Sequence, residues 1–195
     1  LCITDHFFNG NIRIPHDIPW KDRVELFCSG YEDALVEGNK IGLKVFFGWE
    51  FTHIGSDFLT YGLDKNWLLQ NENCHDLSLG DYAALVRKSG GYIVHAHPFR
   101  QAWYIDMIRL SPKDVDAIEV YNANRLPDEN RKALWYAKEY NLPELCGSDI
   151  HSAHQKNFGL LESPECHNDI YSLISDMKSG KMSIKEINKE NEVIF

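Results

Sequence analysis

The stretch Tyr92-Ile-Val-His-Ala-His-Pro-Phe-Arg100 decides the fold that we expect for this chain. Its β-branched residues follow a Gly-Gly break and predict a buried strand, which Pro98 ends because proline cannot donate to a sheet ladder. Side chains alternate across a strand, so His95 and His97 are predicted to face the same side. Two imidazoles with Arg100 beyond them favour a metal and an anion, although a core histidine and a surface arginine fit the same residues.

Length, composition and charge narrow the class of protein. The chain has 195 residues, 44% of them hydrophobic and 25% charged, which fits one globular domain over 1–195. No apolar run has membrane-spanning length, no secretory signal is expected, and five scattered cysteines without a CxxC predict reduced thiols in the cytoplasm. A formal net charge of −9 argues against loose binding to duplex nucleic acid or membranes. An anionic substrate remains compatible, because bound cations reverse the local field.

Strand and helix patterns alternate along the chain. This alternation predicts an α/β fold with a largely parallel sheet. In α/β barrel enzymes, the active site lies at the C-terminal ends of the strands. The expected strands cover residues 1–4, 44–50, 57–63, 92–97, 116–121 and 142–146, and the expected helices cover residues 20–41, 78–88, 127–140 and 168–179.

Possible metal ligands gather at the predicted strand ends. Mixed imidazole and carboxylate ligands suit zinc, manganese or iron. Ions that share a hydroxide lower its pKa and clamp the oxygens of a phosphoryl group. Each of the possible ligands, taken alone, could equally be a helix cap or a polar residue on the surface. The six predicted ligands are His6, Glu50, Asp57, His97, Asp149 and His151, and Asp5 precedes the first of them.

Four motifs occur in order: Ile3-Thr-Asp-His6, Gly48-Trp-Glu50, Ala96-His-Pro98 and Gly147-Ser-Asp-Ile-His151. Over nearly the whole chain, this ordered set resembles the PHP (polymerase and histidinol phosphatase) domain family. The resemblance implies a distorted (β/α)7 TIM-like barrel whose two to three divalent ions hydrolyse phosphoesters. The short segment after Pro98 leaves no room for an inserted cap domain.

The resemblance also assigns roles to residues. Asp57 stands where similar nucleotide phosphatases carry a histidine, and His53 is its competitor. Asp5 is expected to assist catalysis next to the ligands. The residues that fall on family ligand positions are His6, Glu50, His97, Asp149 and His151.

Other residues near the motifs are expected to assist the reaction or to meet substrate. Arg100 is predicted to bind phosphate through its planar fork, with a solvated arginine as the alternative. Trp103 is expected to stack under a base or sugar, unless it is a core residue, and His154 to line the rim. His95 is expected to orient a ligand, and a plain core histidine fits it nearly as well.

The family's first motif, His-x-His, is not found in this sequence, which begins at the second strand of the family pattern. The resemblance therefore implies a barrel that lacks its first strand. We expect a chain extended upstream to bind more metal, to turn over faster and to melt higher. If the extended chain shows no such gain, then His16, His53, His95 or a neighbouring chain supplies the metal ligands that the His-x-His motif would provide.

The sequence favours a phosphoesterase that acts on a small phosphorylated metabolite or nucleotide. The alternatives are a degenerate PHP domain that binds metal or a partner without catalysis, and a polymerase-type exonuclease module. The short acidic chain argues against the exonuclease, and the ordered motifs argue against an amide-cleaving barrel hydrolase. We expect no membrane partner and no nucleic acid beyond nucleotide size. The sequence predicts neither the substrate nor the oligomeric state.

Overall fold

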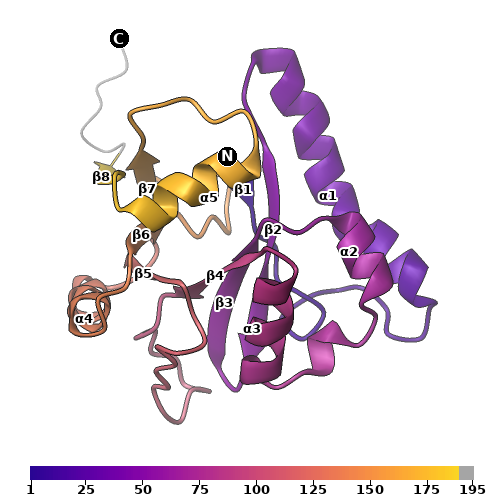
Figure 1. Ribbon diagram of the computed structural model, residues 1–195, viewed down its shortest axis with the longest axis horizontal. Coiled ribbons are helices and arrows are strands. Elements are labelled where there is room, and N and C mark those ends of the chain that lie inside the picture. The colour runs from indigo at the N-terminus through magenta and orange to yellow at the C-terminus, as the bar shows by residue number, and fades with distance from the viewer. Residues whose placement is uncertain (189–195) are drawn as a thin grey trace. The chain divides into compact units, whose positions relative to one another are not determined.

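The computed structural model describes residues 1–188, and the chain divides into two compact units. The first comprises Leu1–Ile93 and His167–Ile174, and the second comprises Val94–Cys166 and the chain from Ser175. Both contain strands and helices, so the predicted α/β class is confirmed (Figure 1). The count of strand–helix repeats and the single-domain organisation stay predictions. No helix in the described part is long and apolar enough to cross a membrane.

The first unit contains a short sheet with three helices. Strand β1 pairs in parallel with β2, but β2 and β3 form an antiparallel hairpin. The expectation of a largely parallel sheet is wrong for this hairpin, because only Ile54 and Gly55 join its strands and a parallel pair needs a long crossover. Both residues have positive φ, 48° and 79°, as tight hairpin turns require. The elements are β1 (Cys2–Ile3), α1 (Trp20–Ile41), β2 (Phe46–His53), β3 (Ser56–Tyr61), α2 (Lys65–Gln70), a 3-10 turn (Cys74–Asp76) and α3 (Leu79–Lys88).

The second unit contains the parallel part of the fold. Strands β4, β5 and β6 pair in parallel in that order, and α4 provides the crossover from β5 to β6. The antiparallel pair β7–β8 was not predicted. The elements are β4 (Tyr92–Ala96, which begins in the first unit), β5 (Ala117–Asn122), α4 (Pro127–Glu139), β6 (Glu144–Gly147), β7 (Asn157–Glu162), α5 (Ile170–Ser179, which also begins in the first unit) and β8 (Ser183–Asn188).

Local sequence signals explain where the helices of the first unit begin and end. Helix α1 ends at Gly42, whose φ of 74° lets its N–H donate to the carbonyl of Gly38. Ser78 caps α3 by accepting from the N–H of Asp81. The unpredicted α2 has the same kind of signal, because the side chain of Asp64 caps its first turn.

One face of the β2–β3 hairpin is packed against helices. Trp49 and Phe51, two residues apart on β2, share this face and are fully buried. The Tyr82 ring of α3 stacks on Phe51 with ring centroids 3.8 Å apart, and its hydroxyl accepts from the Trp49 indole N–H at 2.6 Å. Glu50 therefore points to the opposite face, which carries the polar residues described below.

Replacement of Tyr82 by Phe is expected to destabilise the protein by about 1–3 kcal/mol, because the buried Trp49 N–H loses its acceptor. The hydroxyl of Thr60, 2.7 Å from that of Tyr82, loses a partner as well. Urea unfolding measures the difference. The matched control is Tyr140→Phe, at a side chain that is 52% exposed, and it should change the free energy of unfolding little. Equal stability of the two variants would contradict this account of the packing.

Candidate metal centre

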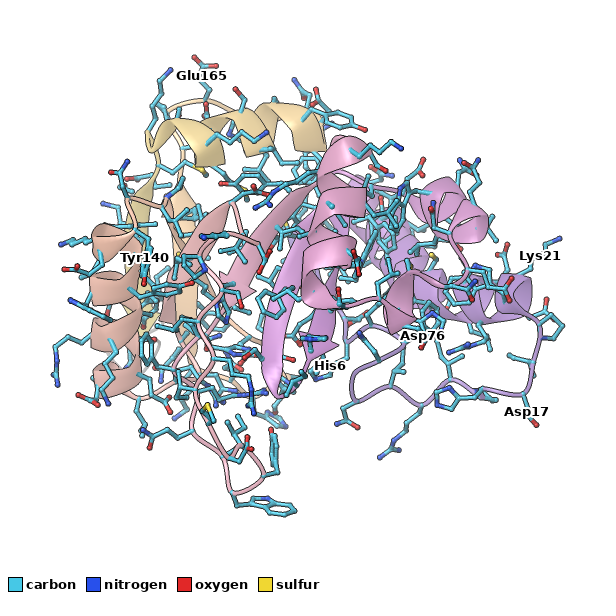
Figure 2. The ribbon with its side chains drawn as sticks, turned by 60° about the horizontal axis from the view of Figure 1, so that its bottom comes forward. His6, Asp17, Lys21, Asp76, Tyr140 and Glu165 are labelled. Carbon is cyan, nitrogen blue, oxygen red and sulfur yellow. The ribbon has the colours of Figure 1, made fainter. Side chains whose placement is uncertain are left out.

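His6 and Glu50 lie side by side in the first unit. Backbone hydrogen bonds hold them in register: the Glu50 N–H donates to the Asp5 carbonyl at 2.9 Å, and the Phe7 N–H donates to the Glu50 carbonyl at 2.8 Å. As a result, His6 Nδ1 is 2.6 Å from Glu50 Oε2. Figure 2 labels His6 near the start of the loop that leads to Asp17. The structure thus brings together two residues that the sequence placed at separate strand ends.

Asp57 on β3 extends the pair of His6 and Glu50 to a row of three side chains. It lies opposite Thr52, which shares the face of Glu50 because the two are separated by two positions on β2. Asp57 is 2% exposed and Glu50 is 7% exposed. The Thr52 hydroxyl donates to Asp57 Oδ1 at 2.7 Å and fixes that carboxylate. His53, the competing candidate, points to the other face of β2, where its ring stacks with that of Phe51.

The Asn9-Gly10 turn supports the row. The Asn9 side chain accepts from the Thr52 N–H at 3.2 Å and donates to the Thr52 carbonyl at 2.8 Å. A Cβ at position 10 would stand 3.0 Å from Thr52 Oγ1 and 3.3 Å from the Cβ of His6, so a larger residue would crowd both. The role of this turn was not predicted from the sequence. Thr52 was detectable by its two-residue spacing from Glu50.

Asp5 does not join the row. Its carboxylate lies on the side of α1, where Oδ2 would be 3.8 Å from a Cβ at Gly30. What Asp5 contributes to the row is its backbone carbonyl, which accepts from the Glu50 N–H. A catalytic role for the Asp5 side chain stays a prediction.

In the second unit, His97 follows directly after β4 in a left-handed conformation with φ of 28°. This backbone geometry is uncommon for a residue with a side chain, and it ends the strand alternation that predicted a shared face for His95 and His97. The His97 N–H donates to Glu119 Oε2 at 2.9 Å. The His97 carbonyl accepts from the Arg100 N–H at 2.9 Å, which closes the turn. His97 is 7% exposed.

His95 occupies a core position. It is fully buried, and its ring meets that of Tyr136 edge-on with centroids 5.9 Å apart. Burial, assisted by the charge of nearby His97, lowers the pKa of His95 to about 3 and keeps the imidazole neutral near pH 7. This position fits the core alternative, and the catalytic role of His95 stays a prediction.

Glu119 holds the turn that contains His97. Its Oε2 accepts both the His97 N–H and a 3.0 Å hydrogen bond from the Asn122 side chain. A Cβ at Gly147 would lie 2.1 Å from Glu119 Oε1, so the glycine at the end of β6 makes room for the carboxylate. Burial raises the pKa of Glu119, and the charge of His97 opposes the rise. The contact between Glu119 and the His97 turn was not predicted from the sequence.

Asp149 and His151 lie together just after β6. Asp149, with φ of 47°, has Oδ1 at 3.2 Å from His151 Nδ1 and Oδ2 at 4.0 Å from Arg125 Nε. The Asn124 amide donates to the Asp149 carbonyl at 3.5 Å. The His151 side chain is 59% exposed and accessible to a ligand. Arg125 and Asn124 follow the end of β5, so strand-end position was the signal that could have identified Arg125.

The predicted substrate residues lie on exposed or half-buried loop positions. Arg100 follows the His97 turn, and its Cζ is 5.9 Å from the ring centroid of Tyr104. Trp103 is 96% exposed, so the alternative of a core tryptophan is wrong. His154 is also exposed, and its N–H donates to the Ser152 hydroxyl at 3.1 Å.

The donor chemistry of a metal centre occurs in two groups of residues. The first group is His6, Glu50 and Asp57, and the second is His97, Asp149 and His151. Imidazole nitrogen combined with carboxylate oxygen suits divalent transition metals. In each group, a neighbouring side chain orients a ligand, as is usual around bound metals: Thr52 orients Asp57, and Glu119 orients His97. The residues present therefore fit divalent ions.

Comparison with known proteins identifies the fold. No family model matches the chain, and no curated protein matches it significantly. A solved two-domain protein from Bacteroides vulgatus, described as containing a predicted PHP-like metal-dependent phosphoesterase, has a TM-score of 0.66 at 14% identity over 96% of this chain. The chain shares its fold with that protein. It spans 55% of the length of that protein.

Two other solved structures share the fold of this chain. A protein from Bifidobacterium adolescentis, provisionally described as a metal-dependent phosphoesterase, has a TM-score of 0.51 at 14% identity over 89% of this chain and 83% of its own. PsfC from Pseudomonas syringae has a TM-score of 0.57 at 18% identity, over 96% of this chain and 90% of its own. At these identities the likeness concerns the fold alone, and it is consistent with the resemblance of the ordered motifs to the PHP domain family.

Proposed function

We propose that this protein is a metal-dependent phosphoesterase. The observation that carries the proposal is the row of His6, Glu50 and Asp57, in which two buried carboxylates and an imidazole share one face in a PHP-like fold. Buried carboxylates need compensation by cations or hydrogen bonds, and divalent ions provide the strongest local charge. The descriptions of the Bacteroides and Bifidobacterium proteins support the same class of reaction.

The metal ligands are assigned to both groups. His6, Glu50 and Asp57 form one group, and we assign further ligands to His97, Asp149 and His151 for about two or three ions of zinc, manganese or iron. When bound, such ions supply a hydroxide of lowered pKa and stabilise charge on phosphoryl oxygens. Glu119 and Thr52 keep their ligands in the required orientation.

The substrate is assigned to small phosphorylated metabolites or nucleotides. The planar guanidinium of Arg100 matches two phosphate oxygens and cannot bind a cation. The exposed indole of Trp103 offers a surface on which a base or sugar can stack.

Arg100→Ala is expected to lower kcat/KM by about 10- to 100-fold, as loss of a charge-assisted hydrogen bond predicts, and to leave metal content intact. Steady-state kinetics with a phosphoester and elemental analysis provide the two measurements. Arg131→Ala removes an exposed arginine of α4 that pairs with Asp128, and it should leave both the kinetics and the metal content unchanged. Metal loss in Arg100→Ala, or unchanged kinetics, would count against a phosphate-binding role.

The proposed function is tested with metal-stripped protein reloaded separately with zinc, manganese or iron. A panel of phosphomonoesters and phosphodiesters, including nucleotides, is then assayed for released phosphate or alcohol. We expect hydrolysis that requires metal and disappears on chelation. Binding of metal without hydrolysis of any phosphoester would overturn the proposal and favour a non-catalytic metal-binding domain.

A further inference from the structure

Arg23, in the first turn of α1, is a buried cation. It is 8% exposed, and its Cζ lies 4.8 Å from the ring centroid of Phe8 and 5.4 Å from that of Trp20. Its Nη2 is 3.4 Å from Nδ1 of His16, and its Nε is buried without a hydrogen-bond partner. Within residues 1–188, no carboxylate forms an ion pair with Arg23.

A guanidinium in this state lacks a counter-ion. Arginine is rarely buried unless it is paired, because removal of its charge from water is costly. The two aromatic faces of Phe8 and Trp20 offset part of that cost. They do not accept hydrogen bonds in the plane of the guanidinium, where Nε points. An oxyanion supplies both the charge and the in-plane acceptors that are missing.

The start of α1 adds further donors at the same place. The helix has 22 residues, and Pro19 caps it without a side-chain hydrogen bond. The N–H groups of Asp22 and Arg23 donate to the Pro19 carbonyl, whereas those of Trp20 and Lys21 have no partner within the helix. Arg23 turns back toward this positive end of the helix dipole, because it contacts Trp20 and His16 rather than the next turn.

His75 also lies beside Trp20, and it brings no charge that would neutralise Arg23. Its ring stacks on Trp20 at 5.3 Å with an interplanar angle of 8°, and its Nδ1 is buried without a hydrogen-bond partner. Burial lowers the pKa of His75, so its imidazole is neutral near pH 7. Asp76, labelled in Figure 2 together with Asp17 and Lys21, is 3.6 Å from His75 Nε2 and forms no ion pair with Arg23.

We propose that Arg23, His16 and the first turn of α1 form a binding site for an oxyanion, either a phosphate or a carboxylate group. The site uses none of the residues assigned to the metal centre, so it does not depend on the phosphoesterase function. In this site, the planar guanidinium of Arg23 and the free N–H groups of the helix would donate hydrogen bonds to the oxyanion.

The test uses the full chain, stripped of metal and freed of chelator, because common chelators are themselves carboxylates. Inorganic phosphate and succinate are titrated separately in calorimetry and thermal melting, with sodium chloride at equal ionic strength as the reference. We expect saturable binding of at least one oxyanion and a saturable rise in Tm. The two titrations distinguish a phosphate site from a carboxylate site.

Arg23→Met keeps the aliphatic volume of the side chain and should weaken oxyanion binding by about 10-fold or more. Arg131→Met, at an exposed ion pair on α4, is the matched control and should bind normally. His16→Ala changes an exposed residue, so it keeps the test decisive if Arg23→Met does not fold, and it should weaken binding by about 3-fold. Oxyanion binding no stronger than that of chloride, or wild-type affinity in folded Arg23→Met or in His16→Ala, would overturn the proposal.

Discussion

Glu50→Gln is expected to lower kcat for phosphoester hydrolysis by on the order of 100-fold or more, because even residues that only support metal ligands cost 10- to 100-fold when changed. The amide keeps the size of the side chain but removes its charge, and a neutral amide is a weak ligand for transition metals. It also weakens the 2.6 Å contact that orients His6. Initial rates at saturating metal, with circular dichroism to verify folding, measure the effect.

Glu37→Gln is the matched control for this substitution. Glu37 is an exposed residue of α1 and contacts Lys40 at 2.6 Å, so the same chemical change there should leave kcat unaffected. A Glu50→Gln enzyme with wild-type kcat and wild-type metal content would show that the row on β2 and β3 is not the metal centre.

Gly147→Ala is expected to weaken binding of divalent metal by about 10-fold or more through its effect on a supporting residue. The new Cβ would lie 2.1 Å from Glu119 Oε1, so the carboxylate must move. His97 then loses the acceptor that holds its N–H in the left-handed turn. Equilibrium dialysis against manganese, without any substrate, reports the affinity directly.

Gly30→Ala serves as the control for an added methyl group. A Cβ at Gly30 would meet only Asp5 Oδ2, at 3.8 Å, so metal affinity should not change. Glu119→Met removes the acceptor without crowding at Gly147 and should reproduce the weaker binding. Wild-type metal affinity in both folded variants, Gly147→Ala and Glu119→Met, would contradict the positioning role of Glu119.

Local patterns predicted most elements of the fold. The helix predicted over residues 20–41 matches α1 to the residue, and the β-branched run before Pro98 identified β4. The antiparallel β2–β3 hairpin was missed because its turn, Ile54-Gly55, has isoleucine where two-residue hairpin turns usually have asparagine, aspartate or glycine. The β7–β8 pair was missed because strand pairing across a long sequence separation is not visible in local periodicity.

The strand-end prediction was correct for His97, which follows β4, and for Asp149, which follows β6. It was wrong for Glu50, which lies within β2, and for Asp57, which lies near the start of β3; these two share a face through antiparallel pairing instead of a common strand end. The strand alternation that predicted a shared face for His95 and His97 ends before His97, whose φ of 28° is not that of a strand. The contact between Glu119 and Gly147 depends on the approach of two strands, and sequence spacing alone cannot show it.

The most direct test of the central claim counts metal ions bound per chain. Wild type, Asp57→Asn and the exposed control Asp33→Asn are stripped, reloaded with manganese or zinc, freed of unbound metal and analysed by elemental mass spectrometry. Asp57 is 2% exposed beside Glu50, so the account predicts that Asp57→Asn loses bound metal whereas Asp33→Asn matches wild type. Equal metal content in wild type and folded Asp57→Asn would contradict the assignment of this row as a metal centre.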